Sequence, residues 1–215
     1  MDNIALADEL AERLSVALVG LPTGFLDSFE YTRTGRNLTH PIVWGLLARI
    51  LWEMPNVAFV GVDVRLNLGG GVKFQPDLVA YGPDWGHLFF VDYESPNSSD
   101  ARVPIKDVDA YLAWGQDSGG KPPYLVVTTL PNQSSPAWEL RWTSGGFYNR
   151  RFRGRRADVR ESPFNFWYSL YEEEFRTRDM TGVCLVNIDG ARAKRAYPRT
   201  DHGERVRHAS RDVGD

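Results

Sequence analysis

The chain has 215 residues, of which 42% are hydrophobic and 25% are charged. This composition is ordinary for a folded globular protein and excludes wholesale disorder. The length suffices for one well-cored domain, or for a domain with an appendage. No apolar run approaches the roughly 20 residues that a membrane-spanning helix requires, so we expect no membrane partner.

The N-terminal stretch MDNIALADELAERL carries acidic side chains where a secretory signal carries basic ones. Cys184 is the only cysteine, which excludes an intrachain disulfide and a cysteine-based zinc site. A chain without disulfides is typical of a reducing compartment. These features predict a cytoplasmic protein.

The net charge of −3 is unevenly distributed along the chain. Residues 1–140 hold 9 Lys and Arg against 17 Asp and Glu, a balance of −8, whereas residues 141–215 hold 16 against 11, a balance of +5. An acidic half joined to a basic half is what a metal-dependent enzyme that acts on a polyanion needs. Ordinary variation between segments gives the same pattern, so the charge distribution alone does not identify such an enzyme.

The first half of the chain predicts two helices followed by a strand meander. Helical spacing of Ile4, Leu6, Leu10 and Leu14 predicts a helix over residues 4–19. A second helix is expected to begin near Thr39, with Pro41 in its first turn, and to stop at Pro55. Glycine-rich turns then separate three expected strands, over residues 57–66, 72–81 and 88–94.

The second half begins with an expected helix over residues 103–115 and a buried strand over residues 123–130. After Pro131 the pattern weakens, with a strand expected at 137–142, a helix at 163–176 and a strand at 182–188. The polar, Arg-rich residues beyond Gly190 are expected to be flexible. The order of elements predicts an α/β fold with a mixed central sheet flanked by helices.

Three acidic residues lie in or beside strands that are otherwise apolar. Asp77 stands in the second expected strand, and Asp92 and Glu94 close the third. Burial of a carboxylate in such surroundings costs several kcal/mol unless it is paired or bound to a metal. The two-residue period of a strand places Asp92 and Glu94 on one face, and a hairpin would bring Asp77 beside them. Converging carboxylates suit Mg²⁺, although each acid alone could be a solvated strand end.

The spacing of these acids resembles that of a nuclease superfamily. Pro76-Asp77, followed about fifteen residues later by Asp92-x-Glu94, is similar to the PD-(D/E)xK motif, with Glu94 where the usual Lys would stand. A closer resemblance is to the Uma-two group of restriction-endonuclease-like proteins, over about residues 39–130. Two positions depart from that group: Asp92 replaces the more usual Glu, and Tyr111 comes about one residue late. The matching residues, in chain order, are His40, Pro76-Asp77, Asp92, Ser95-Pro96, Lys106, Tyr111 and Tyr124-Leu-Val-Val127.

The resemblance implies a restriction-endonuclease-like core at about 39–130. With the pattern of the remaining residues, we expect one domain of residues 1–190, with an α+β extension at 131–190, and a flexible basic tail at 191–215. It implies Mg²⁺-dependent hydrolysis of phosphodiester bonds in DNA, with Mn²⁺ as a substitute cation. Asp77, Asp92 and Glu94 would hold the metal. Lys106, reaching the site from a helix, would orient the nucleophilic water or stabilise the transition state.

A basic run later in the chain is a candidate contact for nucleic acid. Arginine side chains bind phosphate oxygens in a fork geometry, so such a run suits a nucleic-acid backbone; a solvated loop is the plainer interpretation. If each chain carries one active site, cleavage of both DNA strands favours a two-fold homodimer. The run consists of Arg150, Arg151, Arg153, Arg155 and Arg156.

Two other functions remain open at this point. The same fold could serve as a catalytically inactive nucleic-acid-binding or scaffold protein, and the replacement of Glu by Asp92 fits such a loss. A carboxylate site could also belong to a small-molecule metalloenzyme, against which the Arg-rich second half argues. Metal-dependent nicking separates the enzyme from the binder, and salt-sensitive retention on DNA separates both from the small-molecule enzyme.

Overall fold

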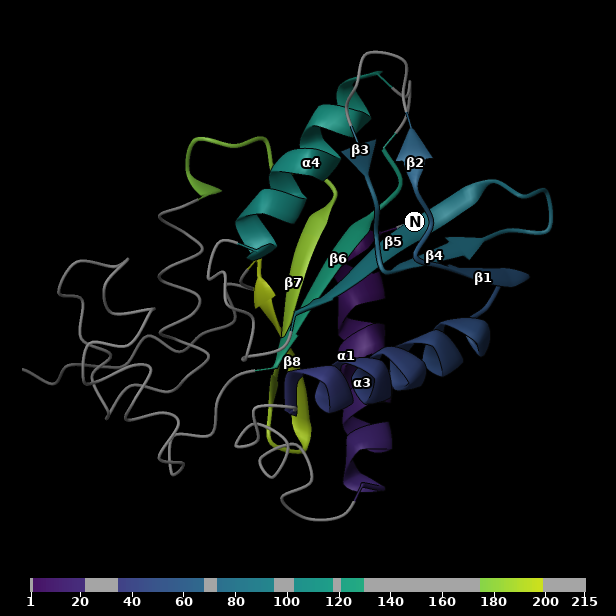
Figure 1. Cartoon of the computed structure of the whole chain (residues 1–215), viewed down its shortest axis with the longest axis vertical. Helices are drawn as coiled ribbons and strands as arrows, with labels where there is room; N and C mark the ends of the chain where they lie inside the picture. The colour runs from purple at the N-terminus through teal and green to yellow at the C-terminus, as the bar shows by residue number, and fades with distance from the viewer. Residues whose placement is uncertain are drawn as a thin grey trace, which may run out of the picture.

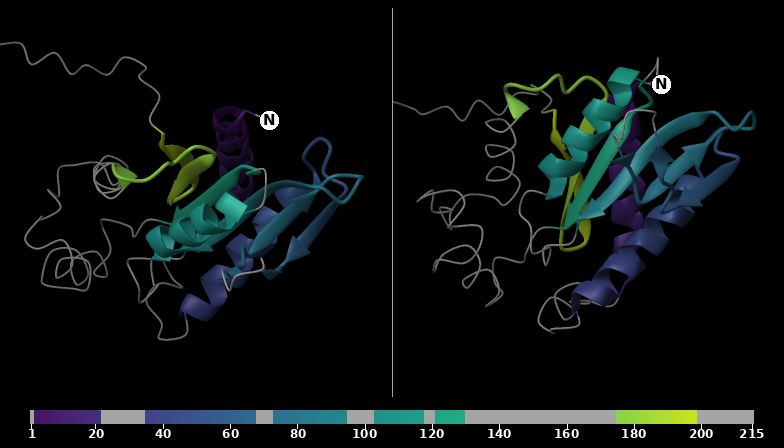
Figure 2. Two further views of the ribbon diagram at one scale, coloured as in Figure 1. Left: turned by 90° about the horizontal axis from the view of Figure 1, so that it is seen from above. Right: turned by 45° about the horizontal axis from the view of Figure 1, so that its top comes forward.

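The computed structural model describes residues 2–21, 35–67, 73–94, 103–117, 121–129 and 175–198. Within these ranges the chain forms a mixed, twisted six-stranded sheet with α-helices on both faces (Figures 1 and 2). The predicted α/β class and mixed central sheet are therefore confirmed.

The central sheet has the strand order β1-β4-β5-β6-β7-β8. Antiparallel pairing joins β1 to β4, β4 to β5 and β7 to β8, whereas β5, β6 and β7 run parallel. A separate antiparallel pair joins β2 (Leu66–Asn67) to β3 (Lys73–Phe74). The strands of the central sheet are β1 (Phe59–Val62), β4 (Leu78–Tyr81), β5 (His87–Glu94), β6 (Tyr124–Thr129), β7 (Val183–Asp189) and β8 (Arg192–Tyr197).

Three helices cover this sheet: α1 (Asn3–Val19), α3 (Gly35–Trp52) and α4 (Val103–Asp117). Helix α1 begins after Asp2, whose side chain accepts a hydrogen bond from the Ile4 N–H and so caps the first turn. Its leucines recur at helical spacing and are buried against the sheet. Figures 1 and 2 show α1 and α4 on opposite faces of the sheet.

Alternation along each strand divides the buried residues into two cores. On β6, Leu125 and Val127 pack with α1 and α3, whereas Tyr124 and Val126 pack with α4. We call these the α1/α3 face and the α4 face. The first consists mainly of aliphatic side chains, and the second centres on aromatic rings around Phe74.

The structure confirms most of the expected elements and moves several boundaries. The second helix begins at Gly35 and holds Pro41 inside it, rather than beginning near Thr39. A proline there removes a single hydrogen-bond donor, and the apolar contacts of the remaining helix outweigh that loss. The expected strand at 57–66 is divided at Asp63, whose φ of 53° lies in the left-handed region and breaks the extended backbone. The expected strand at 72–81 likewise becomes β3 and β4.

The expected flexible tail from residue 191 is wrong at its start. Residues 192–197 form β8, which pairs with β7 and contacts α1. Arg195 is buried and bonds to Asp8 of α1, so a polar side chain anchors a strand that lacks large aliphatic residues. β7 and β8 also belong to the central sheet rather than to a separate extension. The strand expected at 137–142, residues 163–174 of the helix expected at 163–176, and the tail beyond residue 198 lie outside the described residues.

Within the described ranges, no helix is both long enough and apolar enough to cross a membrane.

Candidate functional site

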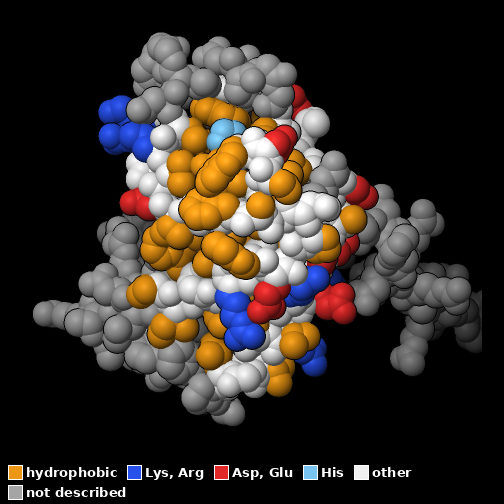
Figure 3. Space-filling view, turned by 90° about the vertical axis from the view of Figure 1, so that its right-hand side faces the viewer, with side chains coloured by type: hydrophobic (Ala, Val, Ile, Leu, Met, Phe, Trp, Pro, Cys, Tyr) orange, Lys and Arg blue, Asp and Glu red, His pale blue; other side chains and the backbone are white. Residues whose placement is uncertain are grey.

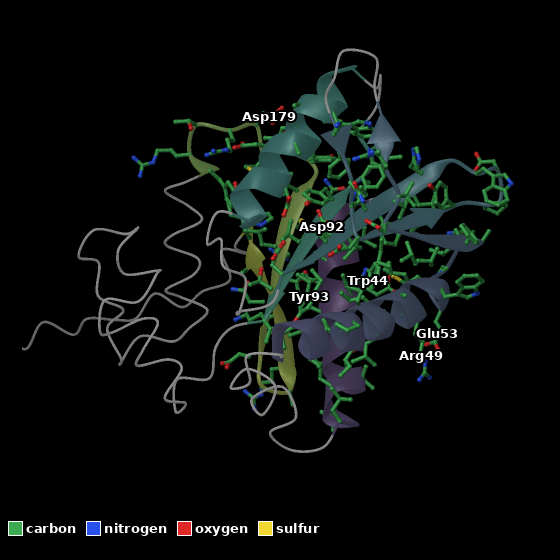
Figure 4. The ribbon with its side chains drawn as sticks, viewed as in Figure 1. Trp44, Arg49, Glu53, Asp92, Tyr93 and Asp179 are labelled. Carbon is green, nitrogen blue, oxygen red and sulfur yellow. The ribbon has the colours of Figure 1, made fainter. Side chains whose placement is uncertain are left out.

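The three predicted acids lie close together where β4 begins and β5 ends. Asp92 and Glu94 share the α4 face, because their neighbours Val91 and Tyr93 point into the opposite core. Asp77 directly precedes β4, the strand that pairs with β5. Figure 4 shows Asp92 in the middle of the sheet. The hairpin predicted from the sequence therefore brings Asp77 beside Asp92 and Glu94.

Hydrogen bonds from backbone N–H groups hold the carboxyl groups of Asp77 and Asp92 in place. The Asp77 N–H donates to Asp92 Oδ1 at 2.6 Å, and the Tyr93 N–H donates to Asp77 Oδ2 at 2.8 Å. The Tyr124 hydroxyl on β6 donates to Asp92 Oδ2. Both oxygens of Asp92 thus accept hydrogen bonds from fixed donors. This arrangement orients the carboxyl group and satisfies it in a buried position.

The electrostatics of the cluster disfavour its negative charges. Burial raises the pKa of Asp92 well above its ordinary value, and the nearby Asp77 and Asp107 raise it further, against the lowering effect of the two hydrogen bonds. The pKa of Glu94 rises to about 9, first through burial and then through Asp107, Asp77 and Asp92. Groups of like charge in a buried site hinder each other's ionisation. A bound cation would reverse this penalty.

Asp107 on α4 is the member of this cluster that the sequence analysis missed. It hydrogen-bonds with Glu94, which donates in its protonated form, and its charge also acts on Asp92. In the sequence it is one acid among several in an amphipathic helix. It lies four residues before Tyr111, whose side chain is buried on the sheet-facing side of α4, and this helical spacing was the available signal.

The predicted cationic partners are not placed by the structure. The backbone of Lys106 lies in the first turn of α4, one residue before Asp107, but its side chain lies outside the described residues. The arginines at positions 150, 151, 153, 155 and 156 also fall outside the described ranges. The roles of Lys106 and of the arginine run therefore stay predictions.

A row of polar residues continues from the acidic cluster across the α4 face. Glu94 lies beside Thr128 on β6, Thr128 beside Asn187 on β7, and Asn187 beside Lys194 on β8. Asn187 is fully buried, and within the described ranges neither its amide nitrogen nor its amide oxygen has a hydrogen-bond partner. An unsatisfied buried amide destabilises a fold, which marks Asn187 as a residue the packing alone does not explain.

The donor atoms of the cluster suit Mg²⁺, which prefers carboxylate oxygens and water. Across the described ranges, no group of three or more His, Cys, Asp or Glu side chains is arranged to hold a metal ion. Mg²⁺ does not require such a cage, since one or two protein carboxylates with water and substrate phosphate suffice. The donors of this cluster therefore fit the cation, while the metal-binding roles of Asp77, Asp92 and Glu94 stay predictions.

Comparison with known proteins adds no relative. No family model, no curated protein and no solved structure matches this chain. The likeness to the PD-(D/E)xK pattern therefore remains one of short motifs.

Proposed function

We propose that this protein is a Mg²⁺-dependent endonuclease that hydrolyses phosphodiester bonds in DNA through the acidic cluster. The observation that carries the proposal is the clustering of Asp77, Asp92, Glu94 and Asp107 at one point of the α4 face, with the pKa of Asp92 and of Glu94 raised. Perturbed carboxylates in one place are typical of functional sites. The motif spacing of Asp77 and Asp92 supports the same chemistry.

In this proposal Asp77 and Glu94 hold the cation, and Asp92 completes or supports its binding. Asp92 is kept in position by the Tyr124 hydroxyl and the Asp77 N–H. A bound Mg²⁺ would supply a water of lowered pKa and neutralise charge that develops on the scissile phosphate. Lys106 orients the attacking water or stabilises the transition state.

The proposed substrate is DNA because the second half of the chain is basic. Each arginine that contacts a phosphate releases condensed counterions, so binding should weaken as salt rises. Replacement of Arg151, Arg153 and Arg155 with Ala should flatten the slope of log K against log salt by roughly 2–3 units, equally for all duplex sequences. An unchanged slope would assign DNA binding to another surface.

The direct test is nicking of supercoiled plasmid with Mg²⁺ or Mn²⁺, against EDTA. We expect cation-dependent nicking by the wild type, and a loss of roughly 10²–10³-fold in Asp77→Asn and in Lys106→Ala. Asp84→Asn and Lys73→Ala are matched controls, because both residues are exposed and neither belongs to the acidic cluster, and they should nick like the wild type. Equal nicking by Asp77→Asn would contradict the proposal.

The second candidate is a catalytically inactive nucleic-acid-binding protein on the same fold. It is favoured by one observation: both Asp92 oxygens already accept hydrogen bonds, from Tyr124 and from the Asp77 N–H. A carboxyl group engaged in this way can serve the fold without a metal. Salt-sensitive DNA retention with no nicking under either cation would establish this second function and exclude the first.

A further inference from the structure

One edge of the central sheet is a short strand whose two ends are exposed and whose middle residues, Val60 and Gly61, are buried. β1 is the outermost strand and pairs only with β4 among the described strands. Its sequence, Phe59–Val62, contains no charged residue and no proline. Natural edge strands are normally protected by charges, prolines, bulges or a covering segment, because an open apolar edge pairs with another chain.

The main chain of β1 has polar groups on its outer side. The Asp63 N–H donates to the Asp77 carbonyl at 2.8 Å, which makes these two residues a hydrogen-bonded pair of the antiparallel ladder. Such pairs alternate along the ladder, so Phe59 and Gly61 bond to β4. The N–H and C=O groups of Val60 and Val62 therefore point outward, where no described strand pairs with them.

Exposed apolar side chains gather at the same edge (Figure 3). Trp52, Phe59, Val62 and Trp85 are 55%, 40%, 51% and 69% exposed. Phe59 links the group, with its ring centroid 6.0 Å from that of Trp52 and 5.5 Å from that of Trp85. We call these four residues the β1 edge surface. Together they expose roughly 400–500 Å² of apolar area, about half of what one partner contributes to a standard interface.

We propose that β1 pairs with β1 of a second copy of this chain, antiparallel, about a two-fold axis at Gly61. In this register Val60 of each copy faces Val62 of the other. The four outward N–H groups of the two strands can then donate hydrogen bonds to the four outward C=O groups. Gly61 faces its own symmetry mate without side chains between them. An antiparallel edge is self-complementary, which is the condition for an isologous dimer.

The charges around the β1 edge surface select a second copy over nucleic acid. Arg49 and Glu53 form an exposed ion pair, Nε to Oε1 at 3.0 Å, at the end of α3 beside Trp52 (Figure 4). A rim that carries both signs can match its own symmetry mate. Asp63 and Asp84 are also exposed near this edge, and their charges would repel a phosphate backbone.

The proposed dimer would join two sheets into one continuous sheet. The two-fold axis of an antiparallel pair runs perpendicular to the sheet, so the α4 faces of both copies lie on the same side. The dimer itself does not depend on the proposed function. If the proposed function also holds, both acidic clusters face one side, as cleavage of the two strands of a duplex requires.

The experiment is sedimentation velocity of the full chain over a wide range of protein concentration. We expect a dimer for the wild type, and a shift to monomer of at least roughly 10²-fold in dissociation constant for Val62→Lys, which adds like charges at the two-fold axis. Val19→Lys is the matched control, because Val19 is 73% exposed on α1, and it should dimerise like the wild type. Circular dichroism verifies that each variant is folded.

A charge exchange at the rim tests the proposed pairing of the two copies. Arg49→Glu should weaken the dimer, and Arg49→Glu combined with Glu53→Arg should restore it, since the rim again carries both signs. A wild type that is monomeric throughout, or a Val62→Lys variant that dimerises like the wild type, would overturn the proposal. So would a monomer whose retention on DNA is lost in Trp52→Ala and Trp85→Ala, which would assign the surface to nucleic acid. A dimer that never nicks DNA would overturn the proposed function alone.

Discussion

The two faces of the central sheet are built from the same strands but differ in their chemistry. On β5 and β6 the residues facing α1 and α3 are apolar or satisfied, such as Val91, Leu125 and the Tyr93 hydroxyl, which bonds to Thr129 Oγ1 at 2.7 Å. The residues facing α4 include Asp92, with its raised pKa, and the neighbouring β7 adds Asn187, whose amide has no hydrogen-bond partner among the described residues. Both faces contain a hydrophobic core, but the α4 face also carries groups that cost stability. Such groups persist where function requires them.

The largest effect should come from the α1/α3 face. Leu125→Ala removes a fully buried side chain from the middle of the sheet and leaves a cavity, so we expect a loss of about 2–5 kcal/mol in unfolding free energy. Val16→Ala, on the exposed side of α1, should change it by less than about 0.5 kcal/mol. Urea denaturation measures both. Similar values for the two variants would refute the assignment of this face to stability.

On the α4 face, Glu94→Gln should stabilise the metal-free protein in a pH-dependent way. The folded pKa of Glu94 is raised to about 9, so its favourable contribution is complete below its ordinary value of 4.5 and is lost as the pH rises through about 9. In EDTA the variant should therefore gain on the wild type with rising pH, by on the order of 2 kcal/mol near pH 9.

Denaturation at several pH values measures this gain. Glu53→Gln, at an exposed position, should give a constant difference from the wild type. A constant difference for Glu94→Gln as well would contradict the mutual repulsion of the four acids.

The smallest effect is expected at Asn187. Replacement by the similarly shaped Leu removes two unsatisfied polar atoms, and should stabilise the protein by about 1 kcal/mol. Thr129→Val removes a satisfied hydroxyl from the opposite face and should cost about 1 kcal/mol. Thermal unfolding compares the two. Destabilisation by both variants would show that Asn187 stabilises the fold, so that it would give no support to a functional role for the α4 face.

The sequence predicts those parts of the fold whose signals are local. The helix at 4–19 and the strands at 88–94 and 123–130 follow from the spacing of their apolar residues, and pairing of adjacent strands brings Asp77 to Asp92. β8 was missed because its residues are mostly polar, although Gly190 in the two-residue turn after β7 was a local hairpin signal. Asp107 was missed because only the packing of α4 against β5 brings it to Glu94, and helical spacing shows no more than the side of α4 on which it lies.

The central claim is that the acidic cluster of the α4 face binds a divalent cation. Calorimetric titration of the metal-free protein with Mn²⁺ tests it most directly, with Asp77→Asn and Glu94→Gln compared against Asp84→Asn. We expect saturable binding by the wild type and by Asp84→Asn, weakened by roughly tenfold or more in Asp77→Asn and Glu94→Gln, because each loses a carboxylate ligand. Absence of binding by the wild type, or equal affinity in all four proteins, would contradict it.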